Sequence, residues 1–289
     1  MGEAPARCGN RARGVAIGRR HPPQQRVADT VPGALLEVQG LCKAFGGVRA
    51  VWDLTFHVAP REVLGLLGPN GSGKTTVFNL VAGALFADAG EVVFSGKSIT
   101  RRAPSDRNVL GIARTYQHVR SLPHLSALDN VVLARLYGAH PAASTPEARQ
   151  EAGDLLDRVG LSWARDLPAG RLTVAERKRL EVARALATRP RLLLLDEPLA
   201  GLNPPEAGEA LALFARIRDE GVTVMVVEHN VGAVRGLCDR VLVLNSGEKI
   251  AEGLPDAVLA DERVVEVYLG ERPGGERVSG ALGGGPALP

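Results

Sequence analysis

Alternating apolar and polar residues mark predicted strands near the start of the chain. A strand is predicted at 35–38, and the alternation at 54–58 is typical of a strand with one exposed face. Residues 91–94, before a turn at 95–97, predict another strand. Together these segments predict a small antiparallel sheet.

Largely apolar runs then alternate with helical segments. Runs typical of buried strands lie at 62–67, 192–195 and 222–227, and the run 192–195 is wholly apolar. Residues 241–244 and 249–251, on either side of a turn, predict two more strands. The spacing of apolar residues predicts helices at 77–85 and 206–219. Buried strands that alternate with helices predict an α/β fold built on a largely parallel sheet.

The middle of the chain has a helical pattern without strands. Between 126 and 160 the apolar residues fall three or four apart. Pro141 and Pro146 interrupt this pattern. We predict a compact helical insertion at about 120–170, rather than a further strand–helix unit.

Both ends of the chain lack such patterning. Residues 1–33 are rich in Arg, Pro and Gly, and residues 272–289 are rich in Gly and Pro. They predict disordered tails around a folded domain at 34–271. The N-terminal arginines are interpreted as a solvated extension, or as the result of a start codon placed too far upstream. Weak attraction to anionic lipid head groups is the alternative.

Composition narrows the setting. Hydrophobic residues make up 45% and charged residues 23% of the 289, as in an ordinary globular protein. No apolar stretch approaches the roughly 20 residues that span a bilayer, and the N-terminus lacks the apolar core of a signal peptide. The net charge of +3 is too small to indicate binding to nucleic acid. We predict a cytoplasmic protein that reaches a membrane only through a partner.

A glycine-rich segment after the strand at 62–67 fits the phosphate-binding pattern G-x-x-x-x-G-K-[ST]. It reads Gly68-Pro69-Asn70-Gly71-Ser72-Gly73-Lys74-Thr75-Thr76. Glycines let backbone amides turn inward around phosphates, Lys74 can reach the β- and γ-phosphates, and the Thr75 hydroxyl can bind Mg²⁺. The strand before it and the helix after it supply the setting that the motif requires. A nucleoside triphosphate site is therefore predicted in preference to a turn that binds nothing.

Asp196 and Glu197 follow the apolar run at 192–195. An aspartate there can hold Mg²⁺, and the next glutamate can accept a proton from water that attacks a γ-phosphate. Acidic pairs at strand ends are common, so the pair alone leaves the choice open. With a phosphate loop upstream, a magnesium site is favoured.

Three further features carry weaker signals. Gln117, near a strand end, can orient water or touch Mg²⁺, and His229, after the run at 222–227, can hydrogen-bond a γ-phosphate. Taken alone, a surface glutamine and a capping or core histidine are the simpler interpretations. Thr173 and Glu176 are spaced as a capping box, which exposes a helix N-terminus to anions but equally fits an ordinary helix start.

In this order and spacing, the motifs resemble the ATP-binding subunits of ATP-binding cassette (ABC) transporters over roughly residues 35–271. The resemblance implies a P-loop NTPase core with a small antiparallel β subdomain and a helical insertion subdomain. It implies that 68–76 is the Walker A loop. Asp196 and Glu197 then correspond to the Walker B aspartate and the catalytic glutamate.

The resemblance also implies roles for more distant residues. Gln117 corresponds to the Q-loop glutamine and would join Thr75 and Asp196 as a metal ligand, and His229 corresponds to the switch histidine. Phe45 would stack on adenine, although a core phenylalanine beside a turn is the alternative. The residues of the signature motif, which acts on the ATP of a second subunit, would be Leu172, Thr173, Val174, Ala175 and Glu176. Asn203 would stand in the D-loop.

Two of these motifs depart from the family pattern. The usual signature is Leu-Ser-Gly-Gly-Gln, whereas Val174 and Ala175 replace both glycines and Glu176 replaces glutamine. Added side chains restrict the backbone and crowd a γ-phosphate that approaches from another subunit. Asn203 stands where aspartate is usual. The departures bear on contacts between subunits and leave nucleotide binding intact.

Within the family, the chain is most similar to the ATPases of branched-chain amino acid uptake, in segments such as 111–117, 194–204 and 268–271. Urea and short-chain amide systems have very similar ATPases. The resemblance implies ATP and Mg²⁺ as ligands, a second ABC ATPase subunit, a membrane permease and an extracytoplasmic solute-binding protein. It implies a peripheral place on the inner face of the membrane.

Two other functions are alternatives to the importer. One is a soluble cassette ATPase acting on nucleic acid or ribosomes, which usually carries two cassettes or a long coiled-coil insertion; the sequence has neither. The other is a catalytically weak, mainly structural subunit paired with a more active paralogue. The altered signature keeps the second alternative open.

Overall fold

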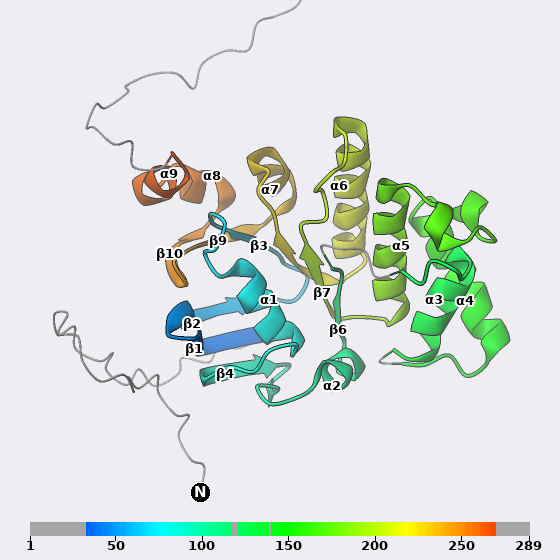
Figure 1. Ribbon diagram of the computed structural model, residues 1–289, viewed down its shortest axis with the longest axis horizontal. Coiled ribbons are helices and arrows are strands. Elements are labelled where there is room, and N and C mark those ends of the chain that lie inside the picture. The colour runs from blue at the N-terminus through cyan, green and yellow to red at the C-terminus, as the bar shows by residue number, and fades with distance from the viewer. Residues whose placement is uncertain (1–32, 117–120, 139, 270–289) are drawn as a thin grey trace, which may run out of the picture.

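The computed structural model describes residues 33–116, 121–138 and 140–269 (Figure 1). A four-stranded antiparallel sheet has the order β2-β1-β4-β5. Its strands are β1 (Leu36–Phe45), β2 (Val48–Val58), β4 (Ala89–Phe94) and β5 (Lys97–Ser98). Buried and exposed residues alternate along the second half of β2, as the sequence predicted.

A second sheet has six strands in the order β10-β9-β3-β8-β7-β6. All neighbours pair in parallel except β9 and β10, which form an antiparallel hairpin. The strands are β3 (Val63–Leu67), β6 (Ile112–Arg114), β7 (Leu192–Asp196), β8 (Thr223–Val227), β9 (Arg240–Asn245) and β10 (Glu248–Gly253). Strands β3, β7 and β8 are buried throughout, which accounts for their continuous apolar sequences.

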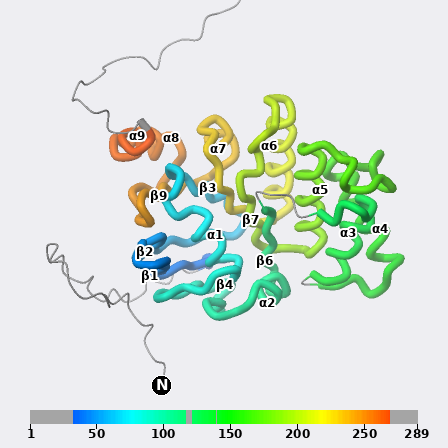
Figure 2. The backbone as a smooth tube through the Cα atoms, in the orientation of Figure 1, coloured from blue at the N-terminus to red at the C-terminus, as the bar shows by residue number. Residues whose placement is uncertain are grey.

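Helices cover both faces of the six-stranded sheet and extend beyond it (Figures 1 and 2). They are α1 (Lys74–Ala82), α2 (Pro104–Val109), α3 (Ala127–Leu136), α4 (Thr145–Arg158), α5 (Val174–Ala187), α6 (Pro204–Asp219), α7 (Val231–Leu237), α8 (Pro255–Leu259) and α9 (Glu262–Leu269). Short 3₁₀ turns lie at Ser162–Ala164 and Ala169–Arg171. Within the described ranges, none of these helices has the length and apolar character needed to cross a membrane.

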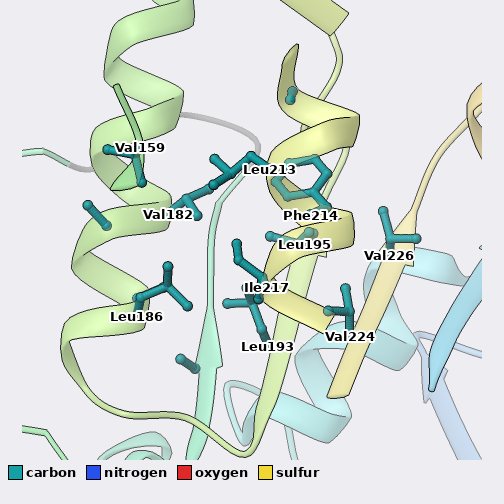
Figure 3. Close-up of a cluster of buried hydrophobic side chains, with 14 of the residues drawn as sticks. Val159, Val182, Leu186, Leu193, Leu195, Leu213, Phe214, Ile217, Val224 and Val226 are labelled. Atoms are coloured by element: carbon teal, nitrogen blue, oxygen red, sulfur yellow. The ribbon is translucent and has the colours of Figure 1, made fainter. Parts of the chain in front are cut away.

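Alternate residues of the same strands enter two separate cores. On one face, Leu194 and Met225 pack with α1 and the antiparallel sheet. On the other, Leu195 and Val226 pack with α5 and α6, and Figure 3 shows Phe214 of α6 against this face. The α/β architecture predicted from the sequence is therefore confirmed, with α1 and α5 on opposite faces of the sheet.

The predicted helical stretch resolves into α3 and α4, joined through 137–144. The prediction that Pro146 interrupts the helical pattern was wrong. Pro146 lies in the first turn of α4, just after the N-cap Ser144. Proline is tolerated there because the first amides of a helix have no partner within the helix. In Figure 1, α3 and α4 stand beyond α5, at the end of the molecule away from α8 and α9.

Candidate functional site

The glycine-rich loop connects β3 to α1, as predicted. Gly68, Gly71 and Gly73 have φ angles of 144°, 79° and 103°, in the left-handed region that favours glycine. A Cβ atom at Gly68 would lie 2.2 Å from the carbonyl oxygen of Leu244, and one at Gly73 would lie 2.3 Å from that of Ala50. Only glycine fits at these two positions, whereas a Cβ at Gly71 would meet open space.

Lys74 begins α1 and folds back over the loop. Its Nζ donates to the carbonyl oxygens of Gly68 at 2.7 Å and of Pro69 at 2.8 Å. Burial lowers the pKa of Lys74, while the charges of Glu197 and Asp196 oppose that shift. The ammonium is therefore held inside the loop with two carboxylates nearby.

The loop has the donors that a chain of phosphates requires. The Ser72 hydroxyl is buried and has no hydrogen-bond partner within the described ranges. Asn70 and Thr75 are exposed, and Thr76 is half-buried. An unpartnered hydroxyl beside a helix N-terminus favours an anion, so this loop fits a nucleotide.

Asp196 ends β7 as a buried side chain, 5% exposed. Its Oδ2 accepts a hydrogen bond from Arg114 at 2.7 Å. Among the described residues no group of three or more His, Cys, Asp or Glu side chains is placed to hold a metal. Mg²⁺ in phosphate sites needs only one or two carboxylates, with phosphate oxygens and waters completing its shell, so Asp196 with the Thr75 hydroxyl fits this ion.

Glu197 and His229 lie together at the ends of β7 and β8. Oε1 of Glu197 is 2.7 Å from Nε2 of His229. Glu197 has a φ of 47°, which is unusual for a residue with a side chain, and its amide donates to the carbonyl oxygen of Val227 at 3.0 Å. The neighbouring strand thus holds a strained backbone in place, which is typical of functional sites.

The predicted signature residues begin α5, on the face of the sheet opposite α1. The capping box is present: the Glu176 amide donates to Thr173 Oγ1, and the Thr173 amide donates to the Glu176 carboxylate. Val174 is 48% exposed, while Leu172 and Ala175 are buried.

Two other predicted residues lie at the edges of the site. Asn203 caps α6 and forms a second capping box with Glu206. Phe45 is 46% exposed at the end of β1, and Lys43 Nζ lies 5.5 Å above its ring. Gln117 falls outside the described residues. Tyr116, just before it, lines a small hollow between the ends of β6 and β7 and the helices α5 and α6.

The site also contains side chains whose place the sequence did not predict. Arg114 ties Asp196 to Asn79 of α1, and Lys178 of α5 donates to the carbonyl oxygens of Glu197 and Pro198 at 3.0 and 3.1 Å. Tyr268 accepts a hydrogen bond from the Gly68 amide. A charged residue at the end of an apolar strand, such as Arg114, usually needs a partner of opposite charge, so its pairing could have been expected from the sequence. Lys178 lies in an amphipathic helix, where lysines are common, so the sequence does not indicate its role.

Comparison with known proteins places this geometry in context. Residues 51–200 match the model of the ABC transporter family, and residues 248–273 match that of the branched-chain amino acid ATP-binding cassette transporter. The chain is 37% identical to the high-affinity branched-chain amino acid transport ATP-binding protein BraF of Pseudomonas aeruginosa and 35% identical to LivG of Escherichia coli K12. Each alignment covers 82% of this chain and 98% of the relative.

Solved structures agree with these sequence matches. A nucleotide-free ATP-binding cassette from an ABC transporter superposes with a TM-score of 0.76 at 31% identity, covering 82% of this chain and 100% of the other. A dimeric ATP-binding cassette in a post-hydrolysis state with ADP and Pi superposes with a TM-score of 0.69 at 25% identity, covering 76% and 98%.

Proposed function

The chain belongs to the ABC transporter family as one of its ATP-hydrolysing subunits, and we propose that it powers the uptake of branched-chain amino acids through a partner permease. The observation that carries the ATPase chemistry is the Glu197–His229 pair beside the Lys74 loop. The solute rests on the match of residues 248–273 and on the names of BraF and LivG.

In the proposed site, residues 68–76 bind the phosphates and Lys74 turns from its loop carbonyls to the β- and γ-phosphates. Thr75, Asp196 and Gln117 hold Mg²⁺, which neutralises part of the phosphate charge when bound. The exposed ring of Phe45 stacks on the adenine. Binding and orientation supply most of the rate, because phosphoryl transfer needs little covalent help from the protein.

Glu197 is the proposed general base. Its carboxylate accepts a proton from the attacking water. The 2.7 Å contact with His229 Nε2 orients that carboxylate before nucleotide binds. When the γ-phosphate is in place, His229 Nε2 would leave Glu197 and hydrogen-bond the phosphate. The two residues come from adjacent strands, so the sheet sets their separation.

We further propose that two ATPase subunits enclose each ATP. Packing of α1 and α5 on opposite faces of the sheet supports this arrangement, because Thr173 and its neighbours are then available to a second subunit's phosphate loop. The permease would dock between the segment around Gln117 and the helical insertion, at the inner face of the membrane. An extracytoplasmic solute-binding protein would complete the importer.

Glu197→Gln tests the assignment of the base. Steady ATP turnover should fall at least about 100-fold, because the amide cannot take the proton. Binding of a fluorescent ATP analogue should persist. The control is Glu248→Gln, which changes an exposed glutamate on β10 and should leave turnover unchanged. Normal turnover in the Glu197 variant contradicts the assignment.

The solute is tested with the whole transporter in proteoliposomes. Uptake and ATP turnover should rise with leucine, isoleucine or valine and not with urea or acetamide. If only urea or acetamide stimulates uptake and turnover, the chain belongs to a urea or amide uptake system instead. Turnover that stays negligible until a paralogous ATPase is added would identify a catalytically weak subunit.

A further inference from the structure

The C-terminal helix α9 reaches the phosphate loop through one side chain. The backbone amide of Gly68 donates to Tyr268 Oη at 2.8 Å, across 200 residues of sequence. Gly68 is a buried residue at the end of β3, so its amide needs a hydrogen-bond partner, and the Tyr268 hydroxyl supplies one. Tyr268 is 40% exposed, and the partial burial of its phenol raises the pKa of the hydroxyl, which keeps the oxygen protonated at physiological pH.

Helix α9 is anchored independently of this bond. Val264 is 2% exposed and belongs to the larger core. The Asp261 carboxylate accepts from the Arg263 amide at 2.9 Å at the start of the helix. Figure 1 places α9 beside α8 and β10, so the helix docks on the fold through Val264 as well as through Tyr268.

The preceding hairpin contacts the same loop. The Gly247 amide, in the turn between β9 and β10, donates to the Ser72 carbonyl oxygen at 3.0 Å. The Leu244 carbonyl oxygen lies 2.2 Å from the position that a Cβ of Gly68 would take. The segment from β9 to α9 therefore braces the loop at both of its ends.

We propose that Tyr268 is a positioning residue for the phosphate loop, so that docking of α9 and binding of nucleotide strengthen each other. The inference rests on the proposed function, because it concerns the same loop. A loop held in left-handed backbone conformations binds more tightly when it is ordered beforehand. Coupling of this kind is reciprocal: whatever α9 adds to nucleotide affinity, nucleotide adds to the docking of α9.

Tyr268→Phe in the full chain tests the proposal, because it removes the hydroxyl and keeps the ring. Affinity for a fluorescent ATP analogue should weaken roughly three- to tenfold, since the buried Gly68 amide loses its partner. The KM for ATP should rise with little change in kcat, and hydrogen exchange at 68–73 should quicken. Tyr137→Phe is the matched control, since Tyr137 is 75% exposed at the end of α3.

A second measurement needs no variant. In the wild-type chain, ATP with EDTA should slow hydrogen exchange in α9, and this protection should be lost in Tyr268→Phe. Wild-type nucleotide affinity and loop exchange in the variant, or no protection of α9 by ATP, would overturn the positioning role while leaving the ATPase intact. A wild-type chain that binds no ATP would overturn the proposed function, and the inference with it.

Discussion

Arg114 connects more parts of the candidate site than any side chain predicted from the sequence. Its guanidinium pairs with Asp196 at 2.7 Å and bonds Asn79 of α1. It also lies 5.8 Å from the Phe78 ring and 5.1 Å from the Tyr116 ring. The two charged side chains are 7% and 5% exposed, and breaking such a buried pair costs about 3–5 kcal/mol. We therefore expect Arg114 to hold the Asp196 carboxylate in one orientation.

Arg114→Met should weaken the response to Mg²⁺ and spare nucleotide binding itself. Without its partner, the Asp196 carboxylate loses its fixed orientation, and loss of a group that orients a metal ligand costs roughly 10- to 100-fold in metal affinity. The measurement is binding of a fluorescent ATP analogue in EDTA and across a Mg²⁺ titration. The affinity for the analogue in EDTA should be unchanged, and the Mg²⁺ concentration at the midpoint of the titration should rise.

Arg135→Met is the matched control for that experiment. Arg135 is 2% exposed and pairs with Glu151 between α3 and α4, away from the loop. Its replacement should lower the melting temperature without moving the Mg²⁺ midpoint. An equal effect of both variants on the midpoint would mean that Arg114 acts through stability alone.

At the scale of residues, sequence predicted the types of groups in the site better than their partners. Lys74, Asp196, Glu197 and His229 were each predicted from a local motif and lie near one another in the structure. The pairing of Arg114 with Asp196 was not predicted, because it joins residues 82 apart through the register of β6 on β7. Tyr268 was likewise missed, since no local pattern reports a contact with Gly68.

At the scale of elements, α5 connects the proposed signature motif to the backbone of the proposed base, two features that were predicted from separate motifs. Its N-terminus carries the altered signature, and one turn later Lys178 holds the carbonyl oxygens of Glu197 and Pro198. Burial lowers the pKa of Lys178, and the nearby Glu228, Glu181 and Glu197 oppose that shift. A displacement of α5 by a second subunit would therefore pull directly on the backbone of the proposed base.

Val174→Gly should raise ATP turnover roughly two- to tenfold if the branched side chain crowds the γ-phosphate bound by a second subunit. Val174 is 48% exposed at the first position of α5, so little packing is lost, and glycine in a helix costs about 1 kcal/mol. Turnover at saturating ATP is the measurement. Reduced turnover would indicate that the valine contributes to the shared site.

Thr145→Gly provides the comparison for Val174→Gly. Thr145 is an exposed, β-branched residue at the first position of α4, behind a Ser N-cap and with Glu147 in the first turn. It should show the same cost in stability with unchanged turnover. A gain seen in both variants would point to a general loosening of the molecule.

Most of the strands and the long helices were predicted, the buried strands from continuous apolar runs and the helices from apolar residues three or four apart. Helix α6, for example, spans Pro204–Asp219 where 206–219 was predicted. Helices α2 and α8 were not predicted, since segments of six and five residues are too short to display a helical period. Strand order was also beyond the sequence pattern, because β3 pairs with β8 and β9, far along the chain.

At the scale of the whole molecule, a buried carboxylate beside the site, that of Glu228, links the stability of the fold to pH. Glu228 follows β8 and is 6% exposed. Its carboxylate accepts from the Leu199 amide at 2.8 Å and from the His229 amide at 3.2 Å. Burial raises the pKa of Glu228 above 4.5, although these amides and the charges of Lys178 and His229 oppose the shift.

This raised pKa predicts a pH-dependent contribution to the stability of the fold. Between 4.5 and the raised value, the folded chain binds more protons at Glu228 than the unfolded chain does. The free energy of unfolding therefore decreases as pH rises through that window, and the contribution is complete only below 4.5. Glu228→Gln cannot release a proton, so its stability lacks this decrease.

The readout is the difference in unfolding free energy between the wild-type chain and Glu228→Gln, from urea titrations between about pH 4.5 and pH 7. Taking the difference removes the titration of all other groups, provided that they are unaffected. The wild-type advantage should be largest at the acid end and shrink towards neutral pH, while the exposed-site variant Glu248→Gln should track the wild type throughout. A difference that stays constant or grows with pH would mean that Glu228 is stabilised as a carboxylate, with its two amides and Lys178 outweighing its burial.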